Sequence, residues 1–205
     1  VLIPAVGTRI AELGALVGSL DAREQIAQIE LAAGDETVVL VFRNLAPLGE
    51  DDRARLREFG RRSGIQIYLQ PGDTASVHPM DGSAADLRFA LPDYDVDFEF
   101  RPLDFVQVNG DMNRRMVNHA LALLDPQPGD RVLDLFCGLG NFTLPLARRA
   151  ASVVGVEGEA GLVQRARDNA RRNRIANVEF HAADLTRDLR GEAWAKQGFD
   201  KLLLD

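Results

Sequence analysis

The feature that most constrains the fold is a regular alternation of apolar segments and helical patterns in the second half of the chain. Four short apolar segments follow one another, at 131–136, 152–157, 178–184 and 199–205. Helical patterns at 142–150 and 160–173 separate the first three. Strands and helices that alternate in this way form parallel βαβ units with right-handed crossovers. The sequence therefore predicts an α/β fold with a parallel sheet in the second half.

The first half shows a different pattern, typical of a small α+β domain. Helical spacing covers 10–20 and 49–64, and the second of these has acidic residues at its start and a glycine at its end, as a helix dipole favours. Strand patterns lie at 24–31, 36–42, 65–70 and 87–102. Because no chemical motif occurs here, we interpret this half as a packing or substrate-docking domain. The predicted limits are 1–102 for the α+β domain and 103–205 for the first part of the sheet domain.

Composition excludes several kinds of site. The single cysteine excludes an intramolecular disulfide framework and a cysteine-based zinc site. The three histidines are scattered, so no metal site is predicted. No apolar run approaches the roughly 20 residues that span a bilayer, and the cytoplasm is the default compartment. The chain starts without Met and stops on a predicted strand, so we expect a piece of a longer protein.

Charge is unevenly distributed between the two halves. The whole chain has a net charge of −7, of which residues 1–100 contribute −8 and residues 101–205 contribute +1. An acidic half does not favour binding to phosphates. If the protein handles nucleic acid, we expect much of the basic binding surface to lie elsewhere.

Glycines and carboxylates gather where the predicted strands end. Ligands bind beyond the carboxyl ends of the strands in an open parallel sheet. Gly138 and Gly140 follow the first strand, and residues without a Cβ allow a tight turn and a close approach of a ligand. The carboxylates at or near the four strand ends are Asp134, Glu157, Asp184 and Asp205. We therefore expect these segments to line one rim of the sheet and to bind a cofactor there.

The spacing of this rim leaves two kinds of cofactor open. Glu157 lies 19 residues after Gly138, a distance that suits a carboxylate accepting hydrogen bonds from ribose hydroxyls in both NAD and S-adenosylmethionine sites. Asp184 could accept a hydrogen bond from an adenine amino group. A dinucleotide site would have its third glycine at position 143, where this chain has Thr143. A nicotinamide-dependent oxidoreductase domain is therefore the weaker alternative.

At this point the residues resemble a known family. The stretch from Asp134 to Gly140 is similar to the first motif, D-x-x-x-G-x-G, of class I S-adenosylmethionine-dependent methyltransferases. Four longer strings resemble the RNA 5-methyluridine methyltransferases: "FVQVN" (105–109), "DLFCGLGNFTLPLA" (134–147), "VVGVE" (153–157) and "GFDKLLLD" (198–205). The resemblance is strongest over 103–205 and weaker before it. It implies part of a class I, Rossmann-like sheet, preceded by a small α+β domain.

The resemblance also implies a role for residues around the glycine loop. Gln107, in the F-x-Q-x-N motif, would contact the methionine portion of S-adenosylmethionine. Phe136 and Asn141 would border the same pocket, and Gly138 and Gly140 would shape the loop.

Three acidic residues complete the implied cofactor site. Glu157 would hold the ribose, and Asp184 would lie near the adenine. Asp205 would begin the D-P-x-R segment that closes the pocket near the reacting methyl group. The pattern at the strand ends points to these three residues independently, whereas only the resemblance points to Gln107.

The one cysteine raises the question of the nucleophile. In this family a cysteine thiolate adds to C6 of uracil, and a general base later removes the C5 proton. Cys137 stands near a predicted helix N-terminus, where the pKa of a thiol can fall, but we favour its packing as a small apolar residue beneath the loop. The resemblance places both the nucleophile and the base beyond residue 205. It also implies an N-terminal OB-like RNA-binding domain and iron–sulfur cysteines, neither of which this chain contains.

The leading hypothesis is that the parent protein methylates C5 of a uridine in 23S rRNA. A tRNA uracil-5-methyltransferase of the same family and an oxidoreductase domain are the alternatives. A third possibility is that the chain by itself is only a binding module, without catalytic residues and inactive alone. The apolar strand at 199–205 would be an exposed sheet edge, so we expect self-association there.

Overall fold

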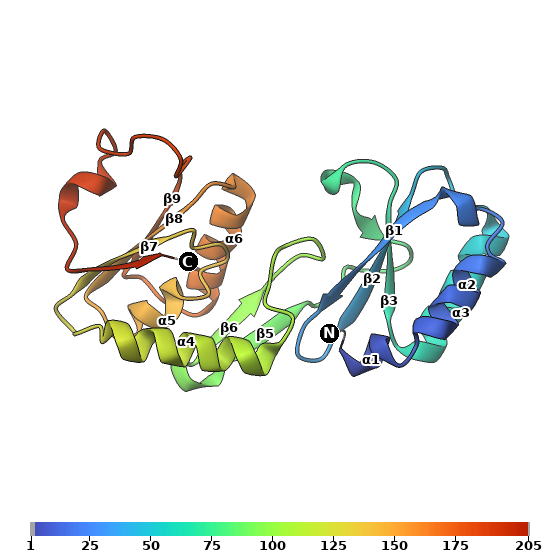
Figure 1. Ribbon diagram of the computed structural model, residues 1–205, viewed down its shortest axis with the longest axis horizontal. Helices are drawn as coiled ribbons and strands as arrows, with labels where there is room; N and C mark the ends of the chain where they lie inside the picture. Colours follow the sequence, from blue (N-terminus) through green and yellow to red (C-terminus); the bar gives the residue numbers. More distant parts are fainter. Residues whose placement is uncertain (1–2, 205) are drawn as a thin grey trace. The chain divides into compact units, whose positions relative to one another are not determined.

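The computed structural model describes residues 3–204, which divide into two compact units. The first unit contains residues 3–88 together with 101–108, and the second contains 89–100 together with 109–204. Each unit has its own sheet (Figure 1). The predicted domain limits, 1–102 and 103–205, stay a prediction, since compactness alone does not fix where a domain ends along the chain.

The first unit is built on a four-stranded sheet in the order β1-β2-β3-β4. Strands β1 (Ile26–Ala33) and β2 (Val38–Asn44) form the predicted antiparallel hairpin. Strand β3 (Gln66–Gln70) runs parallel to β2, and the two-residue β4 (His78–Pro79) runs antiparallel to β3. The mixed sheet confirms an α+β architecture for this part of the chain.

Helices α1 (Pro4–Gly7), α2 (Ile10–Ser19) and α3 (Glu50–Ser63) complete the first unit. Helix α3 begins with three acidic residues and ends at Gly64, whose φ of 73° is left-handed and suits a residue without a Cβ. Leu13 of α2 and Phe59 of α3 belong to the same apolar cluster as Phe42 of β2. The two helices therefore cover the same face of this sheet (Figure 1).

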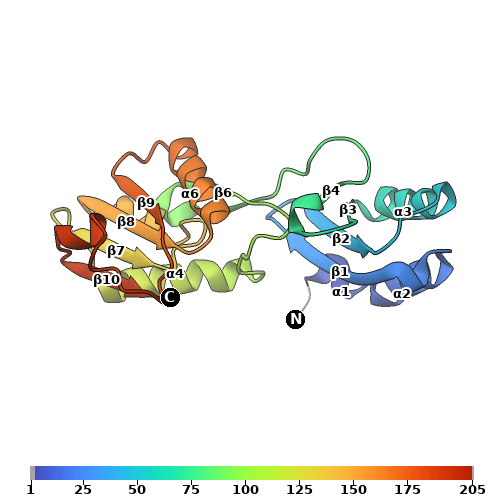
Figure 2. The same cartoon turned by 90° about the horizontal axis from the view of Figure 1, so that it is seen from above.

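The second unit is built on the predicted parallel sheet. Its strands are β7 (Arg131–Leu135), β8 (Ser152–Glu157), β9 (Val178–Ala182) and β10 (Lys201–Leu204), in the order β10-β7-β8-β9. All three pairings are parallel. Figure 2 shows β10 beside β7, at the edge of the sheet. The α/β prediction for the second half is thus confirmed.

Helices and a long loop cover the two faces of this sheet. The helices are α4 (Gly110–Leu124), α5 (Thr143–Ala147) and α6 (Ala160–Arg172). Thr143 of α5 bonds to Asp134 of β7, whereas the neighbouring Leu133 packs with Trp194 on the opposite face. Because side chains alternate along a strand, α5 and the segment 183–199 lie on opposite faces of the sheet.

A short hairpin also packs in the second unit. Strands β5 (Arg88–Leu91) and β6 (Val96–Glu99) pair with each other. The side chain of Asn169 in α6 both accepts from the Glu99 amide (2.9 Å) and donates to its carbonyl (3.2 Å). Asn173, one turn later, does the same for Asp97 (2.8 and 2.7 Å). Two asparagine side chains thus replace the neighbouring strand that β6 lacks on that side.

Candidate cofactor site

The parallel sheet places its four strand ends on one rim, as predicted. From β7 the chain continues to β8 and β9 on one side, and then returns to β10 on the other side of β7. The strand order therefore reverses at β7, and ligands bind preferentially at such a switch point. The glycine loop 136–142 follows β7 directly, so it lies at the favoured position on the rim.

The glycine loop has an unusual backbone. Phe136 (φ 61°), Gly138 (φ 53°) and Gly140 (φ 91°) all adopt left-handed conformations. Glycine does so without a steric penalty, whereas a bulky residue such as Phe136 is strained there. Beyond Gly138 itself and its two neighbours in the chain, no heavy atom lies within 4 Å of the position that a Cβ on Gly138 would occupy, so this part of the loop is open to a ligand. Phe136 is 48% exposed, in agreement with a place at the border of a pocket.

Close packing beneath the loop fixes its height above the sheet. A Cβ on Gly155 in β8 would lie 2.8 Å from the Phe180 ring and 3.0 Å from the sulfur of Cys137. A Cβ on Gly140 would lie 3.3 Å from Leu144 and 3.5 Å from Phe180. Gly155 was not singled out from the sequence, because only the residues folded over it reveal why a side chain is excluded.

The segment that begins at Asp134 lines the rim as expected, but the Asp134 side chain itself is not exposed there. This side chain is fully buried and accepts a hydrogen bond of 2.5 Å from the hydroxyl of Thr143, which is also fully buried. The pair joins the end of β7 to the start of α5 across the glycine loop. Strand alternation explains the difference, since Asp134 points into the layer between sheet and helix.

Glu157, at the end of β8, contacts the glycine loop directly. One carboxylate oxygen accepts a hydrogen bond from the Gly138 amide (3.1 Å), and the other accepts from the Glu159 amide (3.0 Å). The structure thus brings Glu157 and Gly138 together, a contact that the spacing of 19 residues did not by itself predict. A half-buried carboxylate with free lone pairs can also accept hydrogen bonds from hydroxyl groups of a ligand.

Asp184 follows β9, next to the end of β8. The neighbouring amide of Ala183 donates to the carbonyl of Glu157 (3.0 Å), which ties the two strand ends together. The Asp184 carboxylate accepts from the hydroxyl (2.6 Å) and amide (3.0 Å) of Thr186 and from Arg187 (2.9 Å). The hydrogen bond from the Thr186 hydroxyl is the main cause that lowers the pKa of Asp184, so this group stays ionised at neutral pH.

Asn141 pairs with a residue that sequence reasoning missed. Its amide donates to the side-chain oxygen of Asn113 (2.9 Å), and the amide of Asn113 donates back to Asn141 (3.0 Å). Asn113 is buried on the inner face of α4 together with Val117 and Leu121, whereas the neighbouring Met112 is 57% exposed. The signal in the sequence that could have identified Asn113 is a polar residue on the otherwise apolar face of α4.

Two predicted residues cannot be placed on this rim. Gln107 lies in the segment 101–108, which belongs to the first unit, so its role stays a prediction. Asn109, which ends the same "FVQVN" string, has a structural role, since its side chain accepts from the Met112 amide (3.0 Å) and caps α4. Asp205 lies outside the described residues.

Cys137 is buried beneath the loop, as the favoured interpretation predicted. It is 5% exposed, and burial, together with the charges of Asp134 and Glu157, raises the pKa of its thiol far above the ordinary value. A neutral, covered thiol is a poor nucleophile. The residue therefore packs the floor of the site.

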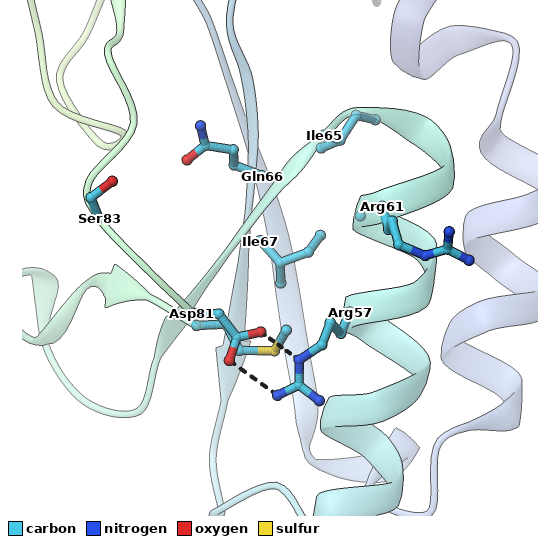
Figure 3. Close-up of a pocket in the computed structure, with 9 residues that line it drawn as sticks. Arg57, Arg61, Ile65, Gln66, Ile67, Asp81 and Ser83 are labelled. Carbon is cyan, nitrogen blue, oxygen red and sulfur yellow. Dashed lines mark hydrogen bonds and ion pairs between the residues drawn. The ribbon is translucent and has the colours of Figure 1, made fainter.

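A surface pocket in the first unit has a different character (Figure 3). It lies between α3, β3 and the loop after β4. Arg57 of α3 forms two hydrogen bonds with Asp81 (2.8 and 3.0 Å), which lower the pKa of that carboxyl and fasten the loop to the helix. Because Asp81 already neutralises the charge of Arg57, Arg57 offers no unpaired charge to a ligand in this pocket.

Within residues 3–204, no group of three or more His, Cys, Asp or Glu side chains is placed to hold a metal ion. None of the helices in that range has both the length and the apolar character required to cross a bilayer.

Comparison with known proteins supports this description. A family model described as a methyltransferase domain matches residues 126–205. The chain is 56% identical over 204 residues to the 23S rRNA (uracil(1939)-C(5))-methyltransferase RlmD of Stenotrophomonas maltophilia (strain R551-3) and 57% identical to that of Xanthomonas campestris pv. campestris (strain 8004). It matches along its whole length in both cases, but covers 46% of each relative.

Solved structures agree on the fold. The tRNA (uracil-54, C5)-methyltransferase of Pyrococcus abyssi, solved with S-adenosyl-L-homocysteine, superposes with a TM-score of 0.61 at 22% identity, over 85% of this chain and 42% of that one. The tRNA m1G37 methyltransferase of M. jannaschii gives a TM-score of 0.52 at 13% identity, over 78% of this chain and 49% of that one. The chain thus matches RlmD methyltransferases along its whole length by sequence, and its second unit carries the Rossmann-like parallel sheet of S-adenosylmethionine-dependent methyltransferases.

Proposed function

We propose that the protein to which this chain belongs transfers a methyl group from S-adenosylmethionine to C5 of a uridine in 23S rRNA. The observation that carries the proposal is the high identity to the RlmD relatives along the whole chain, combined with a glycine loop at the switch point of a parallel sheet. The neighbour from P. abyssi acts on tRNA, but at 22% identity it supports only the fold. The matches described above are all methyltransferases, which disfavours an oxidoreductase.

The rim has the features that S-adenosylmethionine requires. The open Gly138 backbone would lie close to the cofactor, and Phe136 would border it. Glu157 would accept hydrogen bonds from the ribose hydroxyls, and Asp184 from the adenine amino group. Bound there, the cofactor supplies an electrophilic methyl group on its sulfonium.

Three further assignments complete the proposal. Asn141 and Gly140 would shape the pocket from the far end of the loop. Gln107 would contact the methionine portion, and Asp205 would lie near the reacting methyl group. These two roles follow from the resemblance of their strings to the family.

We propose that the remaining chemistry belongs to parts of the protein other than this chain. A cysteine that adds to C6 of the uracil would convert C5 into a nucleophile, which would take the methyl group from S-adenosylmethionine. A general base would then remove the C5 proton while the cysteine leaves C6, which restores the double bond of the ring. Cys137 is unsuited to this role because it is buried and its thiol stays neutral. The whole protein would also contribute an RNA-binding domain and an iron–sulfur cluster, and would act in the cytoplasm.

Binding of S-adenosylhomocysteine to residues 1–205, measured by calorimetry, tests the cofactor assignment. We expect binding, no measurable binding of NAD, and at least a tenfold loss of affinity for Glu157→Gln, equivalent to about 1.4 kcal/mol. Glu159→Gln is the matched control, because Glu159 is a neighbouring acid with a 64% exposed side chain. Tight binding of NAD without S-adenosylhomocysteine would overturn the assignment.

Methyl transfer tests the rest of the proposal. We expect the whole protein to methylate C5 of a uridine in 23S rRNA, and residues 1–205 alone to show no turnover. A methyl group on any other atom would contradict the proposed reaction, and turnover by the isolated chain would return Cys137 to consideration.

A further inference from the structure

The reciprocal pair between Asn113 and Asn141 is a buried contact between two segments far apart in the chain. Each side chain donates one hydrogen bond and accepts one, at 2.9 and 3.0 Å. Asn113 is only 3% exposed, in the first turn of α4, where an unpaired amide would cost free energy. The pair therefore satisfies a buried polar group and at the same time fixes the position of Asn141.

The glycine loop depends on such contacts for its shape. Left-handed conformations at Phe136, Gly138 and Gly140 mean that the loop does not follow a default backbone geometry. Within the described chain, the hydrogen bond between Thr143 and Asp134 joins the two ends of the loop, and Glu157 of the rim accepts from the Gly138 amide within it. The contact with Asn113 comes from α4, an element outside the strands that form the rim.

Helix α4 gives this contact a fixed base. Its N-terminus is capped by Asn109, its inner face is buried at Val117 and Leu121, and Arg114 donates to the Ala90 carbonyl (3.2 Å) of the hairpin. The cap residue ends the same five-residue string that contains Gln107. Asn113 thus connects the helix that follows the "FVQVN" string with the loop that is open at Gly138.

We infer that Asn113 is a positioning residue for the cofactor, which acts by holding Asn141, and with it the glycine loop, in the conformation that binds. The inference rests on the proposed function, since it presumes that the rim binds S-adenosylmethionine. Asn113 acts through Asn141 and is not assigned a contact with the cofactor. We expect an apolar side chain at position 113 to preserve the fold of the unit but to free the glycine loop from α4.

A double-mutant cycle on residues 1–205 tests this role, with S-adenosylhomocysteine as the probe in calorimetry. We expect Asn113→Ala to weaken binding about tenfold, which corresponds to about 1.4 kcal/mol. If Asn113 acts only through its partner, the double variant with Asn141→Ala binds no more weakly than Asn141→Ala alone. Asn113→Asp, which keeps the size but loses the donor, is expected to bind as weakly as Asn113→Ala.

The control is Asn118→Ala, on the same helix. Asn118 donates to Asp93 (2.6 Å) at the exposed hairpin and does not contact the loop, so its replacement should leave the affinity unchanged. Thermal unfolding separates binding from stability, because a purely structural role lowers the melting temperature without changing the affinity of the folded chain. Unchanged affinity in Asn113→Ala, with the unsubstituted chain binding normally, would overturn this inference alone. Failure of the unsubstituted chain to bind would instead overturn the proposed function.

Discussion

Burial decides what each residue at the rim can do. Asp134 and Glu157 are both acids at the ends of neighbouring strands, yet Asp134 is sealed against Thr143, whereas Glu157 is half-buried and reaches the loop. Cys137 stands between them in the chain and is covered by the loop it belongs to. Residue type and spacing in the sequence thus indicate where the cofactor site lies. The direction in which each side chain points decides whether it is buried or can reach a ligand.

The reactivity of Cys137 provides a direct test at this scale. Because its thiol is buried and its pKa is raised, we expect native residues 1–205 not to react with a thiol reagent at pH 8, and to react with one equivalent once denatured. The unfolded chain ionises its thiol first, so raising the pH above the ordinary value of 9.0 should favour unfolding. Rapid labelling of the native chain, measured by absorbance, would contradict this assignment.

At the scale of elements, the second unit is held by close approach between strands and loop. Because Gly155 in β8 has no side chain, Phe180 and Cys137 fill the space above it. The glycine loop can therefore pack closely against the sheet. Asn169 of α6 and Asn173, which follows the helix, hold the β6 strand by its backbone, and Asn113 on α4 holds the loop. Polar side chains on or next to helices therefore link the elements of this unit.

Replacement of Gly155 tests the packing between β8 and the loop. We expect Gly155→Ala to lower the free energy of unfolding by about 1–3 kcal/mol, because the added methyl group would overlap Phe180 and the Cys137 sulfur. Fluorescence of Trp194, the one tryptophan, reports urea unfolding of this unit. The matched control is Gly129→Ala, since nothing lies within 4 Å of a Cβ there. An equal effect of the two substitutions would contradict the packing argument.

At the scale of the whole molecule, the parallel sheet has one edge formed by β10. Among residues 3–204, β10 pairs with β7 alone, and Leu202 (52%) and Leu204 (65%) are exposed. An apolar strand with an open edge is a template for pairing with another strand. The structure therefore shows an exposed apolar edge at β10, where the sequence predicts self-association. The pairing itself stays a prediction.

Sedimentation velocity tests that prediction. We expect residues 1–205 to self-associate in a concentration-dependent way through β10, and Leu202→Lys to restore the monomer by placing a charge on the exposed edge. Leu123→Lys is a control, because Leu123 is an exposed apolar residue (74%) on α4 rather than on the strand. A single monomeric species of the unsubstituted chain at high concentration would show that this edge does not pair.

Hydrophobic periodicity and chain direction are local properties, so the sequence alone predicts the alternation of strands and helices, the parallel sheet of the second half and the position of the glycine loop. It also singled out Glu157, because a spacing of 19 residues from Gly138 suits a ribose-binding carboxylate. The folded chain is needed to see that Asp134 is buried, that Gly155 must lack a side chain and that Asn113 holds Asn141. These depend on which side chains meet across the fold, and contacts between distant segments leave no periodic signal in the chain.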